Sequence, residues 1–183
     1  NMKLLREYIQ QILNEKVYGP VYRATPSPGP EHSGSPQPGR RVTQGMVLYW
    51  APEPRTKAFG KYVTKAMIRL RNPYAGTSTD AYDVAALLDN QKIINILKNL
   101  EDDIGQLEDD EDPLDKLVYT LESMHHDGIW QDPDIVLAIK DAGFDGITSV
   151  DPVGGDTEYI TFNSEQYKIL DQWVDEDRAG ERK

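Results

Sequence analysis

The amino-acid sequence predicts an α+β fold, because β-type runs lie near both ends of the chain and helical patterns lie between them. No internal repeat is visible that would indicate a solenoid or a propeller. The expected strands are residues 21–23, 46–50, 66–71, 146–150 and 158–162. The expected helices are residues 54–65, 83–100, 115–126 and 134–142.

The elements at the two ends of the chain have the clearest local signals. Residues 2–16 place apolar side chains at helical spacing with charge on the opposite face, so we expect an amphipathic helix that ends before Gly19-Pro20. Gly143 follows the last expected helix, at a position that favours a left-handed residue. The sequence DPVGGDT then separates two β-type runs, which predicts a hairpin.

The chain of 183 residues is long enough for one domain with short extensions. We expect residues 1–16 to be an N-terminal helix or leader, 17–172 to be the folded domain, and 173–183 to be a charged tail. Within the domain, residues 24–41 hold five Pro, three Gly and three Ser, which predicts a long mobile loop.

Composition excludes several classes of protein. With 31 acidic and 20 basic residues the formal net charge is −11, which argues against a surface that tracks nucleic acid throughout but leaves a local basic groove open. The chain has no Cys, so disulfides, cysteine zinc sites and thiol nucleophiles are absent. No apolar run approaches the roughly 20 residues of a membrane span. We therefore expect a soluble, cytoplasmic protein with no membrane partner.

Metal and serine-nucleophile chemistry have weak support. His125 and His126 are adjacent, and neighbouring side chains on a helix point about 100° apart, which disfavours shared chelation. The acidic segment 101–115 lacks the ligand spacing of an EF-hand, because Gly105 falls outside that register. No glycine-flanked nucleophilic Ser is visible. We expect no metal.

Three tyrosines and one arginine in the first half of the chain form a distributed pattern. The sequence Tyr22-Arg23-Ala24 closes the first expected strand, and Tyr49 lies at the end of the second. Tyr62 lies on the expected helix that follows.

The second half adds a carboxylate and two short segments. Glu158 opens the last expected strand in EYITFNSEQYKIL, with Gln166 eight residues later, and GFDGI at 143–147 leads into the hairpin. Together with the first-half pattern, these segments resemble the ADP-ribosyltransferase superfamily over about residues 17–170. The final segment resembles the catalytic strand of poly-ADP-ribose polymerases, and GFDGI resembles phage and toxin ADP-ribosyltransferase-like domains.

The resemblance implies a split, mixed β-sheet core and a site for NAD without a metal. Arg23, with its neighbours Tyr22 and Ala24, would hold the dinucleotide. Tyr49 and Tyr62 would bracket the nicotinamide ring. A sixth residue, Glu158, would match the catalytic carboxylate.

These residue types suit the chemistry. Cleavage of the nicotinamide glycosidic bond builds positive charge on the ribose, which a fixed carboxylate stabilises. Arginine offers a planar fork to phosphate or ribose, and aromatic rings stack on the cationic nicotinamide. Each residue also has an ordinary structural interpretation: Glu158 as a strand-end carboxylate, Arg23 as an ion-pair partner, and Tyr49 as a core aromatic.

Two functions follow from these patterns. The first is a mono-ADP-ribosyltransferase that transfers ADP-ribose from NAD to a host macromolecule, with a host protein favoured over nucleic acid as acceptor. The second is a non-catalytic phage virion or interaction protein that retains the fold. Leu5-Arg6-Glu7 and Leu13-Asn14-Glu15 resemble phage prohead-protease sites, which predicts a location in the host cytoplasm or in a virion.

Overall fold

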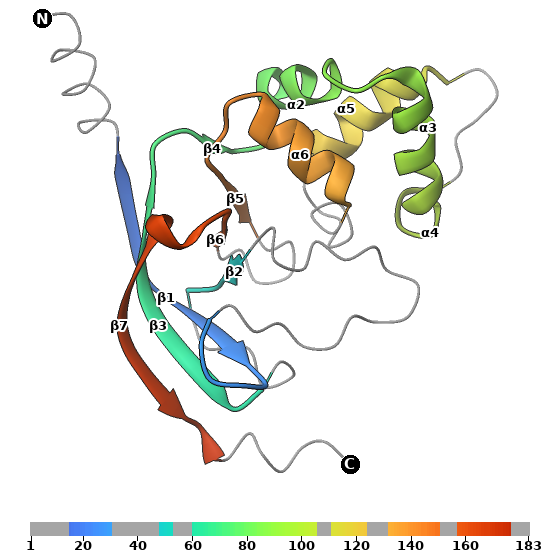
Figure 1. The fold of residues 1–183 in the computed structure, drawn as a ribbon. Helices are drawn as coiled ribbons and strands as arrows, with labels where there is room; N and C mark the ends of the chain where they lie inside the picture. Colours follow the sequence, from blue (N-terminus) through green and yellow to red (C-terminus); the bar gives the residue numbers. More distant parts are fainter. Residues whose placement is uncertain are drawn as a thin grey trace, which may run out of the picture.

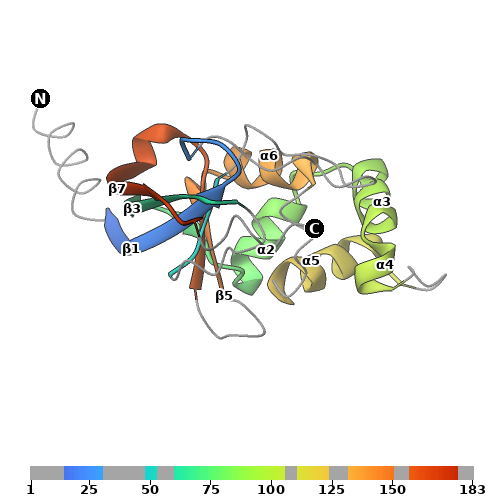
Figure 2. The same ribbon diagram turned by 90° about the horizontal axis from the view of Figure 1, so that it is seen from below.

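The computed structural model describes residues 15–30, 48–52, 60–105, 111–123, 132–150 and 157–176. These residues confirm the predicted α+β class, with two β-sheets and a group of α-helices. Figure 1 and Figure 2 show a three-stranded sheet at one end, the helices at the other, and a four-stranded sheet between them.

The three-stranded sheet is antiparallel and has the order β1-β3-β7. Its strands are β1 at Lys16–Thr25, β3 at Tyr62–Leu70 and β7 at Tyr167–Val174. In β3, Thr64, Ala66, Ile68 and Leu70 are buried at every second position, which is the period of a strand with one face on a core.

The four-stranded sheet is mixed and has the order β2-β6-β5-β4. Its strands are β2 at Leu48–Trp50, β4 at Pro73–Tyr74, β5 at Gly146–Val150 and β6 at Thr157–Thr161. β5 and β6 pair antiparallel, as the hairpin prediction requires, whereas β4 and β5 are parallel.

The helices lie between β4 and β5 in the sequence. They are α2 at Ser78–Ala85, α3 at Asn90–Asn99, α4 at Glu101–Ile104, α5 at Pro113–Ser123 and α6 at Pro133–Asp141. The single helix expected over 83–100 is divided, because the Asp89 side chain accepts a hydrogen bond from the Lys92 amide and caps a new helix there. Gly143 has φ of 89°, as its position predicts.

Two hydrophobic cores hold these layers together. The first core lies between the helices and the four-stranded sheet and includes Tyr74, Leu117, Ile139, Ile147 and Ile160. The second core lies between the two sheets and consists of Val21, Trp50, Ala66, Ile68 and Leu70. Within the described ranges, no helix is long and apolar enough to cross a membrane.

Two assignments from the sequence are wrong, and two strands were missed, the short β4 and the longer β7. Residues 62–65, expected to end a helix, belong to strand β3. Strand β7 was not expected, and it includes Trp173 and Val174 from the supposed tail. A register shift at Leu170 interrupts its alternation, because Ala66 pairs with Ile169 and Lys65 with Asp171.

Three expected segments fall largely on residues that the structure does not describe. Residues 1–14 of the helix or leader expected at 1–16, residues 31–41 of the loop expected at 24–41, and residues 177–183 of the tail lie outside the described residues. Residue 16, expected in the helix, and residues 24 and 25, expected in the loop, belong instead to strand β1, where they pair with β3. His125 and His126 also lie outside the described residues.

Gly146 of β5 lies close to Leu70 of the other sheet. A Cβ atom there would lie 2.5 Å from Leu70 Cδ2 and 2.8 Å from the backbone oxygen of Ile160. The side chain of Leu70 fills the second core, so it has little room to move.

Gly146→Ala should therefore lower the free energy of unfolding by about 1 to 3 kcal/mol, because the added methyl group overpacks this contact. Chemical denaturation measures the change. Thr79→Ala, at an exposed position of α2, is the control and should stay within about 0.5 kcal/mol of the wild type. Equal stability of Gly146→Ala and the control would contradict the packing described here.

Candidate functional site

The short strand β2 brings together the strands that carry the predicted site residues. On one side, Leu48, Tyr49 and Trp50 pair with Thr161, Ile160 and Tyr159 of β6. On the other, the next residue along, Ala51, exchanges two backbone hydrogen bonds with Tyr22 of β1, at 2.7 and 3.0 Å. β1, β2 and β6 are therefore consecutive neighbours in space.

Arg23 is fixed by backbone carbonyls at this junction. Its Nε donates to the carbonyl oxygen of Pro30 at 2.6 Å, and its Nη1 donates to that of Tyr49 at 3.3 Å. The first bond holds the start of the proline-rich segment against β1, and the second spans to β2. The guanidinium thus lies beside the backbone of Tyr49.

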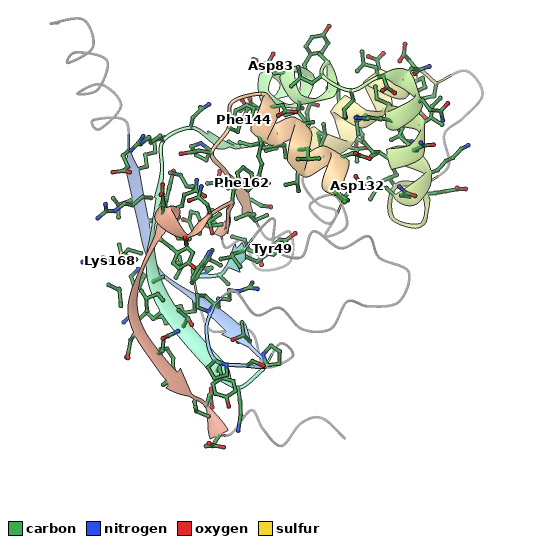
Figure 3. All side chains as sticks on the ribbon, viewed as in Figure 1. Tyr49, Asp83, Asp132, Phe144, Phe162 and Lys168 are labelled. Carbon is green, nitrogen blue, oxygen red and sulfur yellow. The ribbon has the colours of Figure 1, made fainter. Side chains whose placement is uncertain are left out.

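Tyr49 and Trp50 point to different cores. Tyr49 packs against the first core, as does its β6 partner Ile160. Trp50 is buried in the second core, and its Nε1 donates to Thr161 Oγ1 at 3.0 Å. Figure 3 shows Tyr49 between the helices and the three-stranded sheet. Tyr49 therefore has a packing role besides any contact with a ligand.

Glu158 lies on β6, half-buried and opposite Ser149 of β5. The β2–β6 register, extended by one residue, sets Ala51 opposite Glu158. Because Ala51 also bridges to Tyr22, the backbones at Tyr22 and Glu158 are two strand spacings apart, about 9 to 10 Å. Side-chain alternation puts Glu158 on the same face of β6 as Ile160.

Tyr62 lies on the far side of this junction, whereas Ala24 lies on β1 itself. Tyr62 pairs with Thr25 of β1 and Val174 of β7, so β1 separates it from β2. Ala24 is buried and pairs with Val63. The structure thus brings Tyr22, Arg23, Tyr49 and Glu158 onto adjacent strands and leaves Tyr62 one strand further away.

Gln166 has a structural role that the sequence comparison did not reveal. Its Oε1 accepts hydrogen bonds from the backbone amides of Phe162, at 2.7 Å, and Asn163, at 3.1 Å. Its Nε2 donates to the carbonyl of Asp145. Asn163 and Gln166 form a capping box on the short helix η2 at Ser164–Gln166, and the spacing of Asn and Gln could have indicated it.

Asp145 connects the GFDGI segment to the end of β3. Its carboxylate accepts from the backbone amides of Arg71, at 2.7 Å, and Asn72, at 2.9 Å. The Asn72 side chain in turn donates to the carbonyl of Gly143 at 3.1 Å. The two segments that carry the family resemblance in the second half of the chain are thus tied together through Asp145 and Gln166, beside the β6 strand that presents Glu158.

Two tyrosine hydroxyls near β6 have raised pKa values. Burial raises the pKa of Tyr159. Burial, and then the nearby Tyr159 and Asp145, raise the pKa of Tyr18, whose ring centroid lies 4.8 Å from that of Tyr159. Both hydroxyls therefore stay protonated at neutral pH. Among the residues that the structure describes, no group of three His, Cys, Asp or Glu side chains could hold a metal ion.

Comparisons with known proteins leave the family open. No family model matches the chain, and no curated protein matches it. A solved structure described as "Crystal structure of an anti-CRISPR protein" aligns with 87% of this chain and 96% of that chain. The sequence identity is 9% and the TM-score is 0.33, so this likeness carries no argument about function.

Gln166→Ala should lower the free energy of unfolding by about 2 kcal/mol or more. The substitution removes the hydrogen-bond partner of the Phe162 and Asn163 amides and of the Asp145 carbonyl. Glu165→Ala changes an exposed neighbour in the same turn and should be nearly neutral. Thermal denaturation of both variants checks this. If the two variants melt at the same temperature, Gln166 does not hold the segment together.

Proposed function

We propose that this protein is a mono-ADP-ribosyltransferase that uses NAD and needs no metal. The observation that carries the proposal is the adjacency of β1, β2 and β6, which gathers Arg23, Tyr49 and Glu158 from three distant parts of the sequence. These adjacent strands carry an arginine, a tyrosine and a glutamate, the residue types that would bind the phosphates, the nicotinamide ring and the ribose of NAD.

The roles follow from the chemistry of the residues. The bond between nicotinamide and the anomeric carbon of the ribose breaks, and its electron pair leaves with nicotinamide. A nucleophile of the acceptor forms the new bond to that carbon and releases its proton to solvent. Glu158 stabilises the positive charge on the ribose during this exchange. Arg23 binds the dinucleotide, and Tyr49 stacks on the nicotinamide.

The acceptor in this proposal is a host protein. The formal net charge of −11 disfavours nucleic acid as the macromolecule that meets the whole surface of the chain. A protein acceptor needs only a nucleophilic side chain that reaches the anomeric carbon from the open side of the ribose.

A second candidate is a non-catalytic virion or interaction protein with the same fold. The observation that favours it is the engagement of Arg23, whose Nε and Nη1 both donate to backbone carbonyls. Such bonds are typical of an arginine that braces a loop. An Arg has five N–H donors, so bracing and ligand binding are compatible, and affinity for NAD distinguishes the two candidates.

Glu158→Gln keeps the shape of the side chain and removes its charge. It should slow release of nicotinamide from NAD by about 10² to 10³, the typical effect of losing one preorganised electrostatic contact. Glu165→Gln, an exposed acid of η2, is the matched control and should keep wild-type activity. Equal rates for the two variants, at equal melting temperatures, would place the chemistry elsewhere.

Arg23→Lys keeps the positive charge and loses the planar fork. We expect it to raise the Kd for NAD by about tenfold, because one ammonium cannot replace the paired donors of the guanidinium. Calorimetric titration with NAD measures the change, with Arg69→Lys, exposed on β3, as the control. Wild-type protein that does not bind NAD at all would favour the non-catalytic candidate.

A further inference from the structure

The three-stranded sheet has a second face, which we call the outer face. Val21, Ala66 and Ile68 point into the second core, so the residues that alternate with them point the other way. The solvent-accessible part of the outer face comprises Val17 and Tyr22 of β1, Lys65, Met67 and Arg69 of β3, and Lys168, Asp171 and Trp173 of β7. The register also places Ala24 and Val63 on this face, and both are buried. Figure 2 shows the three-stranded sheet at the end of the molecule away from the α-helices, and Figure 3 shows Lys168 on the side of this sheet that lies away from them.

Charge is distributed unevenly between this sheet and the helices. By sequence, β1, β3 and β7 together carry five basic residues and one acidic residue, whereas α2 to α6 carry four basic and nine acidic residues. Among the accessible residues of the outer face, three are basic and one is acidic: Lys65, Arg69, Lys168 and Asp171. A chain with a formal net charge of −11 thus concentrates positive charge on one sheet.

Aromatic rings lie among these cations. The Trp173 ring is 6.2 Å from the Tyr22 ring in an edge-on arrangement, and Trp173 keeps 37% of its surface exposed. Lys65 Nζ lies 6.0 Å from the centroid of the Tyr22 ring. An exposed tryptophan costs apolar burial, and here it stands beside side chains that attract anions.

We propose that the outer face binds single-stranded nucleic acid. Phosphates would meet Lys65, Arg69 and Lys168, while a base stacks on Trp173. Flexible single strands suit this surface because they present phosphates and the flat faces of bases together. From Lys65 to Arg69 the strand runs roughly 13 Å, so the cations track a backbone instead of one anion. An acidic protein could pair with these cations, but its carboxylates would not stack on the Trp173 ring. This inference does not depend on the NAD site.

Fluorescence anisotropy with a labelled oligothymidylate of about 15 nucleotides tests this proposal on the full chain. Trp173→Ala should weaken binding by about tenfold, in the range reported for the loss of one stacked base. Trp173→Phe retains a ring that can pack on the sheet and should lose less. Melting temperatures confirm that both variants are folded.

Salt dependence tests the phosphate contacts separately. The double variant Lys65→Gln with Arg69→Gln should reduce the slope of log affinity against log salt by about 1.4, since each lost contact with a single strand contributes about 0.7. The control, Lys92→Gln with Lys98→Gln, removes the same charge from exposed positions of α3 and should leave the slope unchanged.

Three results would overturn the proposal. They are no binding by the wild type in the micromolar range at low salt, equal slopes for the two double variants, and displacement of the oligonucleotide by a polyglutamate peptide as readily as by unlabelled oligothymidylate. The last result would identify the outer face as a surface for acidic protein.

Discussion

The backbone pairing of β2 on both of its sides is the constraint on which the rest of the structure depends. Leu48–Trp50 forms a ladder with β6, and Ala51 directly after it bridges to Tyr22 of β1. This pairing joins the two sheets through main-chain hydrogen bonds. The two aromatic residues of β2 then serve different cores, because successive side chains of a strand point to opposite faces. Because β2 has only three residues, it forms few hydrogen bonds with β6, and the bridge from Ala51 to β1 adds support on its other side.

The position of β6 depends in turn on the contacts around Asp145 and Gln166. Asp145 binds the amides that follow β3, and Gln166 binds the carbonyl of Asp145 and the amides that follow β6. These bonds tie the ends of β3, β5 and β6 to one another. Gly146 then lets β5 approach Leu70 more closely than any side chain would allow. Polar contacts after the last residue of β6 thus hold the strand that carries Glu158.

Much of the fold could be predicted from local patterns. The α+β class, the β5–β6 hairpin and the end of α6 before Gly143 follow from periodicity and turn residues. β7 could not be predicted in this way. It is an edge strand with a register shift at Leu170, and its exposed apolar residues do not alternate with polar ones. The helix expected over 83–100 is divided at Asp89, where a side-chain cap begins a new helix. The apolar pattern continues through this position, so periodicity alone could not predict the division.

For the candidate site, the sequence predicted that Arg23, Tyr49 and Glu158 lie on strands, but it did not predict the contacts that their side chains make. Tyr22, Arg23, Tyr49 and Glu158 lie on the adjacent strands β1, β2 and β6. Tyr62 lies on β3, beyond β1, because residues 62–65 pair with β1 and β7 as part of a longer strand. The carbonyl partners of Arg23 depend on how Pro30 and Tyr49 approach in three dimensions, and no sequence spacing encodes that approach.

The central claim is that β1, β2 and β6 form one site for NAD. The most direct measurement is the change in backbone amide NMR shifts when NAD is added to isotope-labelled protein. The account predicts that the shifts concentrate at Tyr22 to Ala24, Leu48 to Ala51 and Thr157 to Ile160, with α2 to α6 unaffected. Saturable shifts confined to the helices, or no shifts at millimolar NAD, would contradict it.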